Sequence, residues 1–275
     1  MVGDGDETMP VRVRRERIRE MLREEDFVQV TELSKRFGVS EVTVRSDLDA
    51  LADRGDIRRV RGGAMPRLTP PMAERPFEQV AGEYAAEKQA IGEAAAQLVH
   101  DGETIILDVG TTTTAVARAL VARTDLRNVT VFTNSLTTAL ELESAVPRLM
   151  VVVTGGTLRP LQHSLVDPLG ALVLELVNVD VGTLFVGCNG IHPGRGITNM
   201  SLPEAEVKRR MLRAARRRIV VADGSKVGQV TLAQLCDVGD IDLLITGPSA
   251  DPEIVNDLRQ LGLEVTVVEL KENGT

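Results

Sequence analysis

Hydrophobic and polar residues follow different patterns in the two parts of this 275-residue chain. From about residue 83 onward, short β-branched apolar runs alternate with stretches in which apolar residues recur at helical spacing. The runs predict strands over 104–109, 129–133, 149–154, 183–187, 218–223, 243–246 and 264–270. The stretches predict helices over 83–99, 114–123, 135–145, 203–217 and 252–261. Apolar strands separated by helices are typical of a mainly parallel sheet covered on both faces, so we expect an α/β fold here.

The first part of the chain instead shows short amphipathic helices followed by a hairpin. Apolar spacing predicts a helix over 12–24, and a second helix is expected to begin at the N-cap Thr31 and to end at Gly38. A third helix is expected to run from the N-cap Ser40 to Gly55. The stretch "DIRRVRGGA" then indicates a short strand that turns at two glycines.

A proline-rich break separates these two patterns. The segment "GGAMPRLTPPMAERPFEQVAG" has four prolines and no clear periodicity, which is typical of a linker. We therefore expect a small N-terminal domain over 10–66, a linker over 67–82 and a larger α/β domain over 83–270.

The third predicted helix has two faces of different character. Val44, Leu48 and Leu51 fall on one side and are expected to be buried. The opposite side carries small, polar and basic side chains: Val42, Thr43, Arg45 and Ser46. A short helix that ends at a glycine, followed by such a helix, is typical of a helix-turn-helix, whose second helix enters the major groove. On periodicity alone, an ordinary amphipathic helix with a solvated face remains the alternative.

Arginines on the predicted hairpin favour the DNA-binding interpretation. Arg58, Arg59 and Arg61 lack matching acidic residues nearby in the sequence, and a hairpin after the recognition helix is placed to contact phosphates or a minor groove. The expected partner is double-stranded operator DNA. The residues expected to contact it are Thr31, Ser40, Val42, Thr43, Arg45, Ser46, Arg58, Arg59 and Arg61.

Composition and charge narrow the remaining function classes. The net charge is −8, yet residues 1–68 carry equal numbers of basic and acidic side chains, so all the excess acid lies in residues 69–275. The absence of Trp disfavours a base-stacking platform. Two distant cysteines and three scattered histidines argue for a reducing cytoplasm and against a metal site. With no long apolar run and an acidic N-terminus, we expect neither a membrane span nor a signal peptide.

Hydroxyl- and glycine-rich loops follow three successive predicted strands of the larger domain. In "DVGTTTTAVARAL", Gly110 permits a tight turn and Thr111–Thr113 open a helix whose free N–H groups favour a phosphate, while Thr114 is expected to serve helix capping. "TNS" and "TGG" end the next two strands in the same way, and the three loops are expected to line one crevice. The alternative for each loop alone is a capped helix start. Lys226 and Arg159 follow other strands and are placed to meet a sugar or phosphate oxygen.

Motifs in both domains resemble one known family. The stretch "VTELSKRFGVSEVTVRSDLDALADRGDIRRVRGGA" resembles the N-terminal module of the DeoR family of bacterial transcriptional regulators, except that Ser46 stands where the family more often has a basic residue. The motifs "LDVGTTT", "TNSL", "TGGTLR", "FVGCNGI", "GITN", "AEVKRRM" and "ADGSKVG" resemble the family's second half, which is similar in fold to ribose-5-phosphate isomerases. The resemblance covers residues 12–270.

This resemblance implies a winged helix-turn-helix repressor of carbohydrate genes that acts as a homo-oligomer and is released by a phosphorylated sugar. It also adds Lys208, which lies on a predicted basic helix, to the expected pocket. The full set of expected ligand contacts is Asp108, Gly110, Thr111, Thr112, Thr113, Thr133, Asn134, Ser135, Gly155, Gly156, Lys208, Asp223 and Lys226.

The alternative is a sugar-phosphate isomerase-like enzyme with an appended DNA-binding head. Aldose–ketose isomerisation needs a carboxylate that removes a proton next to the carbonyl. Asn189 and Val207 stand where related isomerases carry acids, although Glu204 and Glu206 lie nearby. We therefore expect a sensor rather than an enzyme, with no cofactor.

Overall fold

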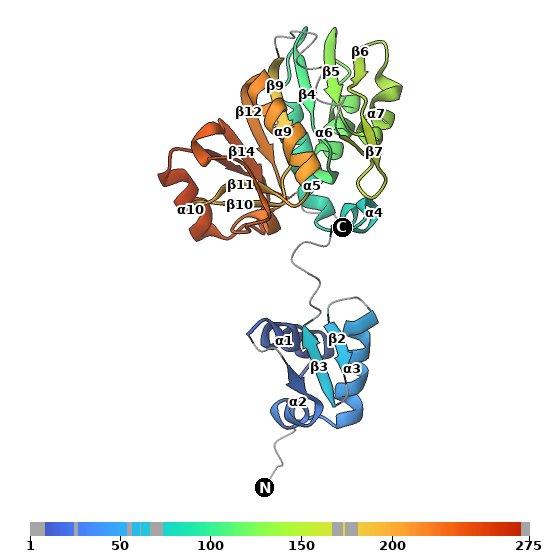
Figure 1. The fold of residues 1–275 in the computed structure, drawn as a ribbon, viewed down its shortest axis with the longest axis vertical. Coiled ribbons are helices and arrows are strands. Elements are labelled where there is room, and N and C mark those ends of the chain that lie inside the picture. The colour runs from blue at the N-terminus through green and yellow to red at the C-terminus, as the bar shows by residue number, and fades with distance from the viewer. Residues whose placement is uncertain are drawn as a thin grey trace. The chain divides into compact units, whose positions relative to one another are not determined.

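The structure is a computed structural model that describes residues 9–24, 27–53, 57–60, 62–66, 74–166, 173 and 181–270. Internal contacts divide the chain into two compact units, residues 1–73 and 74–275 (Figure 1). Each unit has a hydrophobic core of its own. In the part of the chain that is described, no helix is long and apolar enough to cross a membrane.

The first unit packs helices against a small antiparallel sheet. Its elements are α1 (Val11–Glu24), β1 (Val28–Gln29), α2 (Val30–Phe37), α3 (Glu41–Asp53), β2 (Ile57–Val60) and β3 (Gly63–Pro66). The three strands pair in the order β1-β3-β2. Side chains from all three helices, including Ile18, Leu33 and Leu48, meet in one core. This is the winged helix-turn-helix that the sequence predicts.

The ends of the helices test the local predictions in this unit. Gly38 ends α2 in the left-handed region with a φ of 63°, and the Ser40 hydroxyl caps α3, as predicted. The prediction that Thr31 is the N-cap of α2 is wrong. The helix begins at Val30 with Gln29 in the N-cap position, because β1 runs directly into α2 and Val30 is buried in the core.

The two glycines of the hairpin have different roles. Gly62 has a φ of 85°, which side chains rarely permit, and it forms the turn between β2 and β3. Gly63 allows a close approach instead, because a Cβ atom there would lie 2.0 Å from the carbonyl oxygen of Val28 in β1. The pair of glycines thus shapes the turn and attaches it to the rest of the sheet.

The second unit is built on a seven-stranded sheet in the order β15-β14-β12-β9-β4-β5-β6, with every neighbouring pair parallel. Its strands are β4 (Thr104–Leu107), β5 (Val129–Thr133), β6 (Leu149–Val153), β9 (Val181–Val186), β12 (Ala215–Val221), β14 (Leu243–Thr246) and β15 (Glu264–Val267). All seven predicted strands are therefore present, and the predicted α/β class is confirmed.

Each face of this sheet carries a core of its own. Helices α5 (Ala85–Ala96), α6 (Thr111–Ala122) and α7 (Leu136–Leu142) cover one face, where Ile105 and Leu107 of β4 are buried. Helices α9 (Leu202–Ala214) and α10 (Pro252–Gln260) cover the other, where Ile106 is buried (Figure 1). Successive β4 residues thus point to opposite faces, as strand geometry requires.

Several boundaries differ from the predictions. The helix predicted over 203–217 ends at Ala214, because the following residues pair with β9 and begin β12. The predicted linker 67–82 overlaps helix α4 (Phe77–Ala81), whose Phe77 is buried and donates its N–H to Leu161 O at 2.9 Å. Residues 67–73 of that linker lie outside the described residues.

Short strands of three or four residues were not predicted at all. They are β7 (Thr157–Arg159), β8 (Ser164–Val166), β10 (Gly190–His192), β11 (Gly196–Asn199) and β13 (Ala233–Cys236). β7 pairs with β8, and β10, β11 and β13 form a separate small sheet. None of these segments contains a β-branched apolar run like those that predict the strands of the main sheet.

Candidate nucleic-acid interface and ligand cleft

The outward face of α3 presents the side chains that the sequence singles out. Val42 is 71% exposed, Arg45 and Ser46 are exposed, and Thr43 is half-buried beside the Ser40 cap. Val44, Leu48 and Leu51 are fully buried on the opposite side, as predicted. Thr31 is exposed in the first turn of α2.

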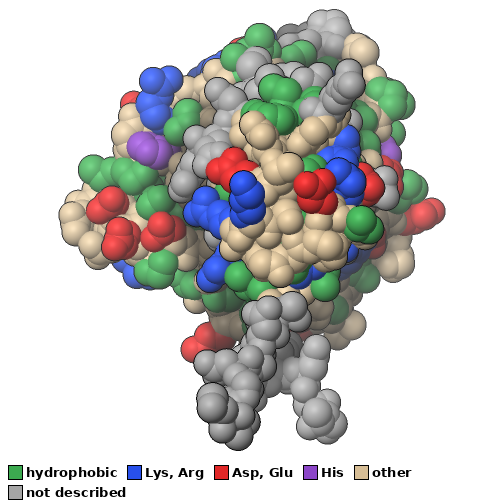
Figure 2. Space-filling model, turned by 90° about the horizontal axis from the view of Figure 1, so that it is seen from below, with side chains coloured by type: hydrophobic (Ala, Val, Ile, Leu, Met, Phe, Trp, Pro, Cys, Tyr) green, Lys and Arg blue, Asp and Glu red, His purple; other side chains and the backbone are tan. Residues whose placement is uncertain are grey.

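Arg45 is held only by a weak local ion pair among the described contacts. Its guanidinium donates to Glu41 Oε2 at 2.7 Å one turn earlier, and both side chains are about half exposed. Exposed pairs of this kind contribute little, about 0.3–0.5 kcal/mol, so a phosphate or base edge can replace Glu41. On the face that Figure 2 draws, Lys and Arg side chains lie next to Asp and Glu side chains and do not form a separate basic patch.

The buried face of α3 carries a charged residue that the sequence pattern did not predict to be buried. Asp47 is 2% exposed and accepts hydrogen bonds from Arg14 Nε at 2.6 Å and Arg15 Nε at 2.7 Å, both on α1. Arg14 is itself buried. The position of Asp47 next to Leu48, on the apolar side of α3, is the signal that could have revealed this link.

The hairpin arginines are only partly described, and one of them departs from the prediction. Arg59 was expected to lack a matching acid, but it donates to Asp49 Oδ1 at 2.8 Å and to Gly63 O at 2.8 Å. This links the hairpin to α3. The Arg58 side chain and Arg61 lie outside the described residues.

In the second unit, the strand order marks where a ligand is expected. From β4 the chain continues to β5 and β6, then returns to β9 on the other side of β4 and continues to β12. Ligands of open parallel sheets bind beyond the carboxyl ends of the strands at such a reversal. The residues just beyond these two ends are Asp108 after β4 and Gly187 after β9.

Helix α6 begins at this point with its N–H groups available. Gly110 precedes it with a φ of 144° and has no side chain with which to cap it. The hydroxyls of Thr113 and Thr114 donate back to Gly110 O at 2.9 and 2.7 Å, so they are engaged within the turn. The backbone N–H groups of Thr111–Thr113 have no acceptor within the helix, and this end of a helix attracts anions.

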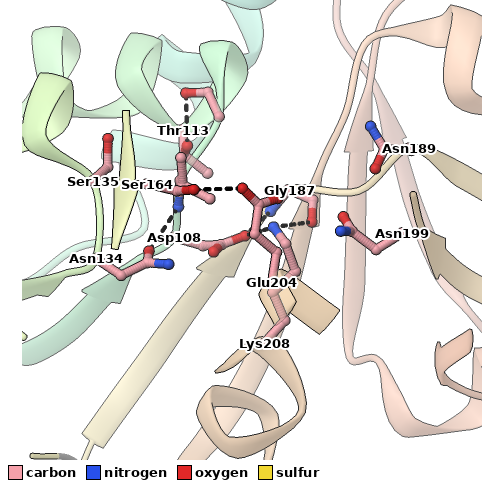
Figure 3. Close-up of polar contacts among 12 residues, drawn as sticks. Asp108, Thr113, Asn134, Ser135, Ser164, Gly187, Asn189, Asn199, Glu204 and Lys208 are labelled. Atoms are coloured by element: carbon pink, nitrogen blue, oxygen red, sulfur yellow. Dashed lines mark hydrogen bonds and ion pairs between the residues drawn. The ribbon is translucent and has the colours of Figure 1, made fainter. Parts of the chain in front are cut away.

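A buried ion pair forms the floor beside this helix (Figure 3). The Lys208 ammonium on α9 donates to Asp108 Oδ2 and, at 3.0 Å, to Gly187 O. Asp108 Oδ2 also accepts from Gly187 N at 3.1 Å, and both charged side chains are buried. Burial raises the pKa of the Asp108 carboxyl, and the adjacent Lys208 ammonium opposes that rise.

The residues around this ion pair line a cavity of about 80 Å³, in which Lys208 is exposed to the cavity and the fully buried Asp108 is not. Its lining consists of Glu74, Val80, Val109, Gly110, Thr111, Thr112, Thr113, Gln162, Gly187, Cys188, Asn189, Asn199, Glu204, Lys208, Val221, Ala222, Asp223 and Lys226. A larger groove of about 650 Å³ lies among α4, α5 and α6, lined by many alanines. The smaller cavity, here called the cleft, is the better ligand candidate because charged groups and a helix N-terminus converge there.

Comparison with known proteins identifies both units. Residues 14–66 match the DeoR-like helix-turn-helix domain, and residues 83–248 match the DeoR C terminal sensor domain. The chain belongs to the DeoR family. It is therefore a DNA-binding transcriptional regulator.

Curated relatives of this DeoR-family regulator match it over most of their length. It is 35% identical to the HTH-type transcriptional regulator GlpR of Haloferax volcanii, over 93% of this chain and 96% of that protein. It is 32% identical to the regulator GolR of Listeria innocua, over 93% and 98%. It is 33% identical to the transcriptional repressor AccR of Agrobacterium fabrum, over 85% and 88%.

Solved structures resemble the regulator at lower similarity. The full-length sorbitol operon regulator SorC of Klebsiella pneumoniae has a TM-score of 0.41 at 12% identity, covering 90% of this chain and 98% of its own. A ribose 5-phosphate isomerase of Methanocaldococcus jannaschii has a TM-score of 0.37 at 19% identity, covering 50% and 52%. Family membership rests on the sequence matches.

Two further predicted contacts of this DeoR-family regulator line the cleft. Lys226 Nζ lies 2.9 Å from Ser225 Oγ and 3.6 Å from Asp223 Oδ1. Asp223 is buried and accepts from Ser225 N at 3.2 Å, so it shapes its own turn. Lys226 remains 26% exposed and is the more accessible of the two.

The "TNS" and "TGG" predictions are not supported by the positions of these loops. Asn134 Oδ1 accepts from Val109 N at 3.0 Å, and Ser135 Oγ caps α7 by accepting from Thr138 N at 3.1 Å. Thr133 Oγ1 accepts from Ser135 N at 3.1 Å. All three predicted contacts are fully buried, and none lines the cleft. Instead, Asn134 braces the loop that carries Asp108, while Thr133 and Ser135 hold their own turn and the start of α7.

The glycines of "TGG" also lie away from the cleft lining. Gly155 and Gly156 have φ values of 77° and 121° between β6 and β7. Only glycine adopts such angles readily, which explains both residues as parts of a turn.

Proposed function

We propose that this DeoR-family regulator represses genes of carbohydrate metabolism and leaves its operator when a phosphorylated sugar binds in the cleft. The observation that carries the proposal is that the N-terminus of α6, which no side chain caps, lines the same cleft as Lys208 of α9 and Lys226 after β12. Free N–H groups and nearby ammonium groups suit a phosphate.

The polar side chains further along the cleft suit the hydroxyls of a sugar. Glu204 supplies a carboxylate, and Asn189 and Asn199 supply amides, within the same lining. Some of their atoms are already used, since Asn189 Oδ1 accepts from Met200 N at 2.8 Å. Two relatives are named as transcriptional regulators, which supports the regulatory role. A third is named as a repressor, which supports repression rather than activation.

On the DNA side, we propose that the chain acts as a homo-oligomer that places two α3 helices in successive major grooves, about 34 Å apart. Operator fragments are first selected from genomic DNA with the purified full-length chain and then footprinted at a stated salt concentration, since affinity depends on salt. A panel of pentose and hexose phosphates is then added, with the unphosphorylated sugars as controls. Loss of protection with a phosphorylated member alone is expected. No change with any phosphorylated sugar refutes the effector.

Arg45→Ala tests the recognition helix. We expect it to weaken operator binding about tenfold or more and to relax preference at one base pair, because a bidentate base contact contributes about 1–3 kcal/mol. Arg195→Ala is the matched control, since it removes one exposed positive charge from the second unit. If both variants bind the operator and its base-substituted forms as the unaltered chain does, α3 does not read the operator.

Glu204 is the residue through which the isomerase alternative can be tested, because it is a carboxylate that lines the cleft and could act as the base. One of its two oxygens is occupied, since Oε1 accepts from Ser164 Oγ at 2.6 Å and from Arg159. Glu206, by contrast, pairs with Arg209 and Arg210 on the outer side of α9. We propose that the chain is not an enzyme. Turnover of a pentose or hexose phosphate that Glu204→Gln abolishes would refute this.

A further inference from the structure

Arg159 joins two carboxylates that come from distant parts of the second unit. One guanidinium nitrogen donates to Glu204 Oε1 and another donates to Glu74 Oε2. The three side chains are mostly buried, with exposures of 21% for Arg159, 19% for Glu74 and 6% for Glu204. The planar guanidinium can serve two carboxylates at once with separate N–H groups, which a lysine does less well.

The two carboxylates belong to different functional regions. Glu204 lies in the first turn of α9, one turn before Lys208, and lines the cleft. Glu74 is the first residue of the second unit, and it directly follows residues 67–73, through which the chain arrives from the DNA-binding unit. Arg159 therefore links the cleft to the point where the chain enters this unit.

Further contacts attach the same entering stretch to the β7–β8 hairpin. Phe77 N donates to Leu161 O at 2.9 Å, and Gln162 Nε2 donates to Arg75 O. The His163 ring lies 5.4 Å from the ring of Phe77. Residues 74–77 are thus held by the hairpin that carries Arg159.

The small size of the cleft favours movement of this stretch when a ligand enters. The cavity measures about 80 Å³, whereas small-molecule sites usually measure about 300–1,000 Å³. Its lining includes Glu74 and Val80 from the entering stretch and Gln162 from the hairpin. The floor is a buried ion pair that joins the end of β4 to α9, whereas the entering stretch and the hairpin belong to neither element, so these are the parts that can yield.

We propose that Arg159 is a positioning residue that couples the cleft to residues 74–82, and that a phosphorylated sugar acts by separating Glu74 from Arg159. The bound sugar phosphate needs space beside Glu204, and it obtains that space by displacing Glu74 and the stretch that follows. Release of this stretch alters the connection to the DNA-binding unit and lowers operator affinity. This inference rests on the proposed function.

The first test needs no ligand. Amide hydrogen exchange is measured on the full chain for Glu74→Ala and for the control Glu83→Ala, which removes a neighbouring glutamate paired with Arg75 in an exposed ion pair. We expect amides of residues 74–82 to exchange about tenfold faster in Glu74→Ala than in Glu83→Ala. Unchanged exchange in α10 shows that the variant is folded. Equal exchange over 74–82 in the two variants overturns the coupling role.

The second test measures operator affinity with ribose 5-phosphate, glucose 6-phosphate and inorganic phosphate. We expect Glu74→Ala without any compound to bind the operator as weakly as the fully loaded unaltered chain, about tenfold below its unloaded state. Arg159→Ala should behave likewise and Arg159→Lys less strongly, while Glu83→Ala should match the unaltered chain. Full operator affinity in Glu74→Ala, with normal release by the same compound, overturns the inference.

The two proposals fail in different ways. If no phosphorylated compound releases the unaltered chain, the proposed effector is wrong, and weak operator binding by Glu74→Ala still supports the link through Arg159. If the unaltered chain responds and Glu74→Ala responds equally from the same starting affinity, the effector stands and the link is wrong.

Discussion

At the scale of single residues, the Asp108–Lys208 pair controls the electrostatics of the cleft floor. Both side chains are buried, and Asp108 Oδ1 has no hydrogen-bond partner among the described residues. A buried ion pair is held at a high desolvation cost, so removal of one partner leaves an uncompensated charge. The lysine here is consequently needed for the fold as well as being a candidate phosphate contact.

Lys208→Met is expected to make stability depend on pH. Burial raises the folded pKa of Asp108 above its ordinary value of 3.8, and loss of the ammonium removes the opposing influence. A group with a raised acid pKa favours the fold only in its protonated form, so its contribution is lost as pH rises above 3.8. Urea unfolding should therefore show a deficit of about 3–5 kcal/mol at pH 8 and a smaller one near pH 4.

The double variant Asp108→Asn with Lys208→Met provides the control for this prediction. It removes both charges, so it should unfold at higher urea than Lys208→Met at pH 8, with little change between the two pH values. A deficit in Lys208→Met that is the same at both pH values would show that lost packing, rather than charge, explains it.

At the scale of elements, Asp47 and Asp49 offer a matched comparison on one helix. Asp47 on the buried side of α3 holds Arg14 and Arg15 of α1, whereas Asp49 is 62% exposed and holds Arg59. Asp47→Ala should destabilise the first unit by about 3–5 kcal/mol, because the buried charge of Arg14 is left without a carboxylate. Asp49→Ala should cost about 0–1 kcal/mol. Exchange rates of α3 amides in the full chain measure both, and equal losses would contradict the assignment.

Elements also show what sequence patterns can and cannot predict here. Period and turn residues located all seven strands of the main sheet and the buried seam of α3, because burial depends on local spacing. They misplaced the end of α9, where Ala215 leaves the helix to pair with Val181 of β9. That pairing joins residues far apart in sequence, and no local pattern contains it.

The same limit explains why several predicted site residues do not line the cleft. Thr133, Asn134 and Ser135 have side chains suited to ligands, yet their actual partners are backbone groups, including Val109 N and Thr138 N. Residue type shows which groups a side chain can bond, whereas the fold determines which of those groups lies next to it. Glu204 and Arg159 are the converse case, since Arg159 bonds to Glu74, 85 positions earlier in the sequence, and to Glu204, 45 positions later.

At the scale of the whole molecule, regulation requires that ligand binding in the second unit changes the free energy of operator binding by the first unit. If a sugar phosphate weakens operator binding by a given factor, operator DNA must weaken binding of that sugar phosphate by the same factor. The coupling is expected to be about 5–150-fold, the usual range for such effects. It does not depend on which residues carry the signal, so it tests regulation independently of Arg159.

Reciprocity gives a prediction for calorimetry on the full chain. The sugar phosphate that releases the operator is titrated into free protein and into protein saturated with operator duplex, with a scrambled duplex as control. We expect the operator to raise the dissociation constant of the sugar phosphate by the factor seen in the DNA-binding assay, and the scrambled duplex to leave it unchanged. If the sugar phosphate lowers operator affinity while the operator leaves its dissociation constant unaltered, linkage is violated. The compound then does not act by binding to this protein, because two ligands of one protein must change each other's affinity by the same factor, wherever they bind.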